Sequence, residues 1–240
     1  MITIVTPTCD RPLPFALAEK YMARQTMKDF QWIVLDDGKT PVVTTMGQTV
    51  IRTNDTYGFS SLPKKLMNLF VDPNRYIKTD SVAIIEDDDW YAPNYLEYMV
   101  GKLSQGDIVG EGRTIYYNVA LRRWAVHTNM THCSLCATGF NRRTFQAFYN
   151  EAACLDPFVD MRFWERASQR FTRLIYDPDR QLCGRTFVGI KGMPGKRGYS
   201  TSHNPDDPNH RNAFQDLDLT KLRSWIGDDA DAYAPFYVQP

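Results

Sequence analysis

The sequence predicts an α/β fold, with a mainly parallel central sheet flanked by helices. Three observations support this: short apolar runs recur along the N-terminal part, segments with helical spacing separate them, and polar loops follow the runs. Apolar runs without alternation are typical of strands that are buried on both faces, and parallel strands need a helix-length connection between them. With 240 residues, the chain is long enough for one large domain or two closely packed halves.

The predicted elements of the N-terminal part follow from the spacing of apolar residues. The β-branched run at 3–6 ends at Pro7, and apolar residues at helical spacing follow it. Strands are predicted at residues 3–6, 32–35, 50–52 and 82–85, and helices at 13–22 and 62–70. The carboxyl ends of parallel strands meet at one edge of a sheet, so the loops at 6–11, 36–38 and 86–89 should form one ligand crevice.

The C-terminal part has shorter predicted elements and one long loop. Strands are predicted at residues 108–109, 114–119 and 122–126, a hairpin turn at 118–121, and helices at 143–152 and 160–171. Residues 189–212 concentrate glycine and proline, which predicts a long functional or mobile loop. The tail combines acidic and aromatic residues and is predicted to pack on the surface; these residues are Asp228, Asp229, Asp231, Tyr233, Phe236 and Tyr237.

The charge is zero overall and uneven along the chain. Residues 1–112 carry a net charge of −4, residues 113–211 a net charge of +7, and residues 212–240 a net charge of −3. The basic part could attract an anionic partner, or the parts could neutralise one another across a packed interface. The candidate anion-binding arginines are Arg122, Arg123, Arg142 and Arg143.

The sequence favours a cytosolic protein. It contains neither a signal-peptide pattern nor an apolar run long enough to span a membrane, and its five cysteines are scattered. Cys133 and Cys136 form one CxxC pair, and a zinc site there would need His127 and His132 as the remaining ligands. Two buried, reduced thiols are the preferred interpretation.

The strongest chemical signal is the acidic cluster, Glu86–Asp89, which directly follows a predicted strand. Adjacent carboxylates repel one another, so holding four of them at a strand end requires a compensating cation. Ligands with oxygen atoms only favour a hard ion such as Mg²⁺ or Mn²⁺. An exposed acidic turn is the alternative, and the two other polar loops predicted beside the acidic cluster favour the cation site.

Three segments resemble GT-A glycosyltransferases similar to family 2. They are ITIVTPTCDRP at the N-terminus, WIVLDDG, and AIIEDDDWYAPNYLEYM, in that order and at matching spacing. The resemblance implies a GT-A sheet in one closely packed domain. Residues 1–112 would bind a nucleotide sugar, and residues 113–240 would bind the acceptor, with the mobile loop 189–212 in that half.

The resemblance also implies roles for individual residues. Donor-binding residues would be Thr6, Pro7, Thr8, Asp10, Arg11, Asp36, Asp37, Asp87 and Asp88, with Lys64 or Lys65, and with Lys196 and Arg197 on the leaving diphosphate. Ligands of Mn²⁺ or Mg²⁺ would be Asp88, Asp89 and His203. The roles of Glu86 and His210 stay open.

The segment LDPFVDMRFWERA at 155–167 resembles the part of the family that holds the catalytic base of inverting enzymes, so Asp160 is the expected base. The residue before it, where the family has an acid, is Val159. A single carboxylate is enough to take a proton from a hydroxyl. Asp156 competes for this role, and Asp160 could instead, or in addition, cap the helix that follows.

The expected activity is therefore metal-dependent, inverting transfer of a sugar from a nucleotide sugar, a UDP-sugar by preference, to an acceptor hydroxyl. One candidate acceptor is a hydroxymethylated base in DNA, as in phage DNA-modifying enzymes, which would place the protein in the host cytoplasm. The alternatives are cell-surface glycan assembly and a non-catalytic nucleotide-sugar-binding module. A sugar nucleotidyltransferase is disfavoured, because residues 7–12 lack a GxGTR-type loop. The oligomeric state stays open.

Overall fold

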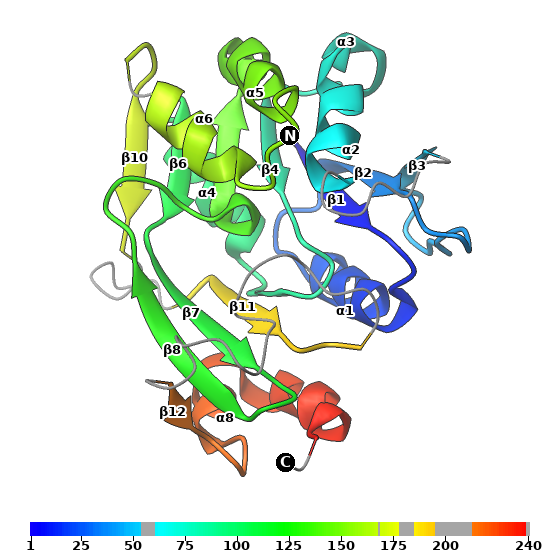
Figure 1. Ribbon diagram of the computed structural model, residues 1–240, viewed down its shortest axis with the longest axis vertical. Coiled ribbons are helices and arrows are strands. Elements are labelled where there is room, and N and C mark those ends of the chain that lie inside the picture. The colour runs from blue at the N-terminus through cyan, green and yellow to red at the C-terminus, as the bar shows by residue number, and fades with distance from the viewer. Residues whose placement is uncertain (54–60, 168, 178–184, 195–212, 239–240) are drawn as a thin grey trace.

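The computed structural model describes residues 1–53, 61–167, 169–177, 185–194 and 213–238 (Figure 1). Its strands form two sheets, one of seven strands in the order β10-β6-β9-β4-β1-β2-β3 and one of five in the order β12-β8-β7-β11-β5. No helix among these residues is both long enough and apolar enough to cross a membrane.

The large sheet is mainly parallel, as predicted. Its strands are β1 (Ile2–Thr8), β2 (Phe30–Asp36), β3 (Thr49–Arg52), β4 (Ser81–Ile84), β6 (Ile108–Glu111), β9 (Thr138–Asn141) and β10 (Arg173–Tyr176). β1 pairs in parallel with β2 and β4, and β6 pairs in parallel with β10. Only β9 runs in the opposite direction within the described sheet, between β4 and β6.

Helices cover both faces of the large sheet. On one face α1 (Pro12–Ala23) and α4 (Tyr95–Leu103) pack on side chains such as Ile4 and Ala83. On the other face α2 (Ser61–Phe70), α5 (Phe145–Ala152) and α6 (Val159–Ala167) pack on Val5, Val82 and Ile84. The remaining helices are α3 (Pro73–Tyr76), α8 (Thr220–Ile226) and the 3₁₀ helices η2 (Leu135–Ala137), η3 (Arg142–Thr144) and η5 (Gly227–Phe236). This double burial accounts for the continuous apolar runs.

The second sheet extends away from the first as a long hairpin with α8 near its far end (Figure 1). Its strands are β5 (Trp90–Tyr91), β7 (Arg113–Asn118), β8 (Arg123–Thr128), β11 (Phe187–Lys191) and β12 (Phe214–Gln215). β5 follows the acidic cluster, and β7 continues β6 after Gly112. The two sheets therefore meet beside the acidic cluster.

Two expectations about the C-terminal part need correction. The predicted loop at 189–212 begins too early, because residues 189–191 belong to the buried strand β11, where Gly189 lets the Tyr116 ring pack closely. The helix expected over 160–171 ends at Ala167, and the chain turns toward β10.

The tail packs against the rest of the domain, and two of its residues, Asp229 and Tyr233, are buried by this packing. Tyr233 is fully buried, and its hydroxyl lies 2.8 Å from that of Tyr21 in α1. Asp229 accepts a hydrogen bond from Trp90 Nε1 at 2.8 Å and pairs with Lys20 and Arg24. These contacts hold η5 against α1 and β5.

Gly112 provides a stability test of the junction between the sheets. A Cβ atom there would lie 2.3 Å from Ile175 Cγ2 and 2.5 Å from the Asn129 carbonyl oxygen. Gly112→Ala should therefore lower the free energy of unfolding by about 1–3 kcal/mol, as expected for overpacking. Gly101→Ala, in α4 with nothing within 4 Å, should instead stabilise by up to about 1 kcal/mol. Denaturant unfolding measures both, and equal effects would contradict the packing at Gly112.

Candidate functional site

The three polar loops that the sequence predicts to meet lie at the carboxyl edge of the large sheet. β1, β2 and β4 are parallel, and Thr8 of β1 lies beside Asp36 of β2 in the register. The acidic cluster leaves β4 at the same edge. Ligands of open α/β sheets bind at this edge, so the topology brings the three polar loops together as predicted.

Arg11 connects the loop after β1 to the acidic cluster. Its guanidinium contacts Asp87 Oδ1 at 2.9 Å and Asp88 Oδ2 at 2.8 Å. The Thr8 hydroxyl donates to Asp87 Oδ2 at 2.7 Å. The Arg11 side chain is only 11% exposed, so its charge compensates two carboxylates that are themselves buried.

The other donor-binding candidates of this loop support the backbone. The buried Thr6 hydroxyl accepts a hydrogen bond from Trp32 Nε1 at 2.9 Å, and Pro7 is half-buried. Asp10, with a φ of 48°, accepts hydrogen bonds from the backbone N–H groups of Lys39 and Thr40. Asp10 therefore ties the loop after β1 to the loop after β2.

Asp36 also holds a loop in place. Its Oδ1 accepts a hydrogen bond from Gly38 N at 2.8 Å, and its Oδ2 accepts from Val42 N at 2.9 Å and Arg52 Nη1 at 2.7 Å. A Cβ atom on Gly38 would lie 2.8 Å from Asp10 N, so this close approach requires glycine. Both oxygens of Asp36 thus accept hydrogen bonds that order residues 38–42.

Asp37 and Lys65 form a buried ion pair. Lys65 Nζ lies 2.8 Å from Asp37 Oδ1 and donates to the Thr8 carbonyl at 3.0 Å, and Ser61 Oγ donates to Asp37. Burial alone would raise the pKa of Asp37, but the charge and hydrogen bond of Lys65 outweigh it and lower the pKa. The structure thus places Lys65 in the site, whereas Lys64 is half-buried on α2.

The acidic cluster is largely desolvated. Asp87, Asp88 and Asp89 are at most 3% exposed, and Glu86 is half-buried. Burial raises the pKa of Glu86 to about 8, and the pKa values of Asp87 and Asp89 to about 6. Lys191 opposes the rise at Glu86 and Asp89, and Arg11 opposes it at Asp87.

Lys191 brings the second cation to the acidic cluster. β11 pairs antiparallel with β5, and this register places the end of β11 beside the residues that precede β5. Lys191 Nζ lies 3.8 Å from Glu86 Oε2 and 3.7 Å from Asp89 Oδ1, and Ile190 N donates to Asp89 Oδ1 at 2.8 Å. Although burial lowers the pKa of Lys191, the surrounding carboxylates raise it well above its usual value, so Lys191 stays charged.

Part of this site fits a divalent cation. Ligand atoms of Glu86, Asp89 and Cys136 lie within 4.8 Å of one another. Among the described residues, Asp89 Oδ2 is a buried atom without a hydrogen-bond partner. Hard cations prefer oxygen, so the two carboxylates fit Mg²⁺ or Mn²⁺ and the Cys136 thiol does not.

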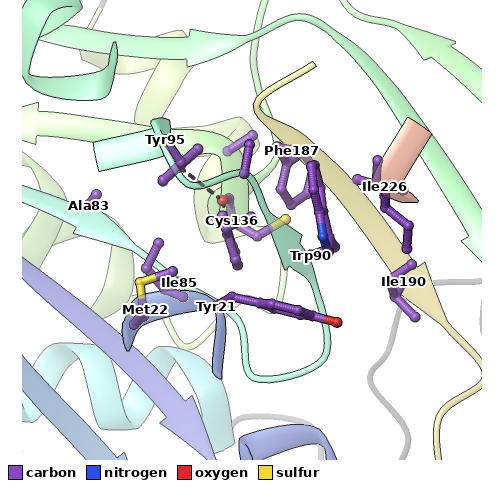
Figure 2. Packing of buried hydrophobic residues seen from close by; sticks show 14 of the residues in the cluster. Tyr21, Met22, Ala83, Ile85, Trp90, Tyr95, Cys136, Phe187, Ile190 and Ile226 are labelled. Atoms are coloured by element: carbon purple, nitrogen blue, oxygen red, sulfur yellow. Dashed lines mark hydrogen bonds between the residues drawn. The ribbon is translucent and has the colours of Figure 1, made fainter. Parts of the chain in front are cut away.

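Cys136 is buried between the acidic cluster and aromatic side chains. Figure 2 shows it near Trp90 and Tyr95, whose hydroxyl donates to the Cys136 carbonyl at 3.4 Å. Burial raises the pKa of the Cys136 thiol well above its usual value, so it stays protonated. The ligand group that contains Cys136 includes neither Cys133 nor a histidine among the described residues, which gives the zinc alternative no support.

Asp160 lies in the first turn of α6 rather than at its N-cap. Its Oδ1 accepts a hydrogen bond from Met161 N at 2.8 Å, and the Leu135 backbone also donates to it. Leu135 begins η2, whose next residue, Cys136, borders the acidic cluster. η2 therefore lies between Asp160 and the acidic cluster.

The two candidate bases differ in their environments. Burial raises the pKa of Asp160 above the usual aspartate value, despite opposing backbone N–H groups and His132. Asp156 accepts hydrogen bonds from Phe158 N and Arg162, and these lower its pKa. A general base works best when its pKa lies closer to the operating pH, so the raised pKa favours Asp160 over Asp156.

Three of the four arginines expected to attract DNA lie elsewhere, and the fourth, Arg123, begins β8. Arg122 is buried and donates to the Ala234 carbonyl at 3.0 Å. Arg142 pairs with Asp80, which precedes β4, and Arg143 pairs with Asp107, which precedes β6. Arg142 and Arg143 therefore lie at the amino edge of the parallel strands, opposite the acidic cluster, and the predicted basic surface beside the site is not formed by these three arginines.

Some predicted site residues lie outside the described part of the chain, and some residues of the site were not predicted. Lys196, Arg197, His203 and His210 lie outside the described residues, as does the segment 54–60. Arg52, Ser61 and Lys191 contact the aspartates of the site, although the sequence pattern does not predict them there. The apolar run FVGI before Lys191 was the available signal, and its glycine suggested a loop.

The buried pair in this site can be tested through stability. Lys65→Met leaves the buried Asp37 carboxylate without its cation, and such losses cost about 3–5 kcal/mol. Lys64→Met on the same helix should cost much less, because that side chain is half-buried. Adding Asp37→Leu to Lys65→Met should recover part of the loss, measured by denaturant unfolding. Similar losses for Lys64→Met and Lys65→Met would contradict the assignment.

No protein-family model matches the chain, and no curated protein matches it. Solved structures of S. aureus TarS do match. TarS 1-349 in complex with UDP matches with a TM-score of 0.53 and 10% identity, over 79% of this chain and 60% of that one. The complex with UDP-GlcNAc matches with a TM-score of 0.51 and 13% identity, over 83% and 60%.

A third crystal structure of S. aureus TarS matches with a TM-score of 0.51 and 10% identity, over 79% of this chain and 36% of that one. The chain thus spans less than two thirds of the TarS chains that it matches. At these identities the likeness concerns the fold. The chain has a mixed α/β fold with a central sheet flanked by helices, and this fold is similar to that of TarS.

Proposed function

We propose that this protein is an inverting glycosyltransferase that transfers a sugar from a UDP-sugar to an acceptor hydroxyl. The observation that carries the proposal is the convergence of Arg11, Lys65 and the acidic cluster at one sheet edge, with Asp160 on the other side of η2. The fold similarity supports it, because TarS structures contain UDP and UDP-GlcNAc.

On the donor side, the protein's own cations and carboxylates would orient the nucleotide. Arg11 lies in the loop after β1 and pairs with Asp87. Lys65 lies on α2 and pairs with Asp37, which directly follows β2. A bound Mg²⁺ or Mn²⁺ would be held by Glu86 and Asp89 and would supply neutralisation of the charge that develops on the diphosphate. Asp88, already paired with Arg11, would border this site. The roles of Lys196, Arg197 and His203 stay predictions.

On the acceptor side, Asp160 acts as the general base. Its carboxylate takes the proton from the acceptor hydroxyl while that oxygen forms a bond to the anomeric carbon. The bond from the anomeric carbon to the diphosphate oxygen breaks, and the nucleoside diphosphate leaves with the electron pair. Attack from the face opposite the leaving group inverts the configuration.

We propose a glycan hydroxyl rather than a DNA base as the acceptor. DNA binding depends on several lysines or arginines that contact phosphates. Arg122 is buried, and Arg142 and Arg143 lie at the opposite edge of the sheet. A sugar acceptor requires no such basic surface.

Asp160→Asn tests the proposed base. The amide cannot accept the proton, so UDP release coupled to transfer should fall by at least about 100-fold. The dissociation constant for UDP should change little, because Asp160 lies beyond η2 from the donor side. Mass spectrometry of reactions with UDP-sugars and either glycans or hydroxymethylated DNA measures transfer, and calorimetry measures UDP binding.

Asp156→Asn is the matched control, because it removes a nearby aspartate of the same loop and helix start. Its transfer rate should stay close to that of the wild type. A large loss in Asp156→Asn with normal turnover in Asp160→Asn would exchange the two roles. UDP binding without turnover in the wild type would instead indicate a binding module.

The pH profile provides a second test of Asp160. The base must be deprotonated, so kcat/KM should fall as the pH falls through its pKa. Because burial raises this pKa, the acid limb should lie above the ordinary aspartate value of 3.8. The residual activity of Asp160→Asn should lack this limb. An acid limb that persists unchanged in Asp160→Asn would assign it to another group.

A further inference from the structure

We propose that Lys191 is a resident cation that shares Glu86 and Asp89 with a divalent metal ion and thereby lowers the affinity for that ion. The inference deepens the proposed function, on which it rests for the presence of a divalent metal ion at the acidic cluster. It concerns one residue of β11, a strand far in sequence from the acidic cluster.

The position of Lys191 is the first observation. Its ammonium lies within 4 Å of both acids, at 3.8 Å from Glu86 Oε2 and 3.7 Å from Asp89 Oδ1. The side chain is 4% exposed, and the Tyr116 ring lies 5.4 Å from Nζ. With its stem buried and β11 paired to β5, Lys191 has little room to leave these acids.

The lengths of these contacts are the second observation. Hydrogen bonds of N–H groups to oxygen have donor–acceptor distances of about 2.7–3.2 Å. At 3.7–3.8 Å, Lys191 compensates charge without using the hydrogen-bonding capacity of the carboxylate oxygens. Asp89 Oδ2 is fully buried and has no hydrogen-bond partner among the described residues. Oxygen atoms are therefore available for a metal ion beside an ammonium group.

The charge balance is the third observation. The acidic cluster carries four carboxylates, and Arg11 and Lys191 are the cations paired with it among the described residues. Each of these two cations faces two carboxylates, so neither cation alone matches the negative charge beside it, and a divalent ion would add compensating charge. Without a metal ion, Lys191 limits the repulsion; with one bound, it repels the ion at short range.

Two consequences follow from this arrangement. Removing the Lys191 charge should destabilise the metal-free protein, because Glu86 and Asp89 lose their cation. It should also tighten metal binding, because the competing charge is gone. A lysine with only a packing role would produce the first effect without the second.

The experiment measures Mn²⁺ binding in the absence of a sugar donor, with the full chain. Isothermal titration calorimetry compares the wild type with Lys191→Met and Lys191→Gln. Lys221→Met is the matched control, since it removes the same charge from an exposed site over Trp124 and Trp225. Thermal unfolding of each protein is recorded with a chelator and with saturating Mn²⁺.

We expect the dissociation constant for Mn²⁺ to fall at least about 10-fold in Lys191→Met, a change that short-range charge repulsion readily produces. Lys221→Met should match the wild type. If a Lys191 variant unfolds in chelator and refolds with Mn²⁺, the proposal is likewise supported.

Three results would overturn the proposal. They are an unchanged or weaker affinity in a folded Lys191 variant, variants that fail to fold whether or not Mn²⁺ is added, and no Mn²⁺ binding by any of the proteins. Since no donor is present, each result is independent of whether the protein transfers sugar.

Discussion

The burial of three adjacent aspartates, with a half-buried glutamate beside them, is the constraint on which the rest of the structure depends. Asp87, Asp88 and Asp89 are desolvated shortly after β4, so the charges of the acidic cluster must be compensated from other parts of the chain. Arg11 comes from the turn after β1, and Lys191 comes from the second sheet. The second sheet is therefore needed for the electrostatic balance of the first.

Much of the fold could be predicted from local sequence, whereas the charge-compensating residues could not. The strands β1, β2 and β4 are continuous apolar runs, because helices cover both of their faces. Lys191 follows a run interrupted by Gly189, and only pairing with β5 and the close Tyr116 ring explain that glycine. A pairing across about a hundred residues leaves no local signal.

The roles of polar residues were harder to predict than their positions. Thr6, Asp10 and Asp36 lie at the predicted edge, yet they accept hydrogen bonds from Trp32, from backbone N–H groups and from Arg52. A carboxylate that orders a loop and one that faces a ligand have the same sequence signal. Only the directions of neighbouring N–H groups distinguish them, and tertiary structure sets those directions.

The contact between η5 and Trp90 has a consequence for folding during synthesis. Asp229 accepts from Trp90 across 139 positions, and Tyr233 meets Tyr21 across 212. Domains fold as they leave the ribosome, and contacts this distant form last. The strand that follows the acidic cluster must therefore wait, with Trp90 and Tyr21 uncovered, until residues 229–233 have emerged. A chaperone that covers this surface on the nascent chain would act at the stage when the protein is most exposed to aggregation.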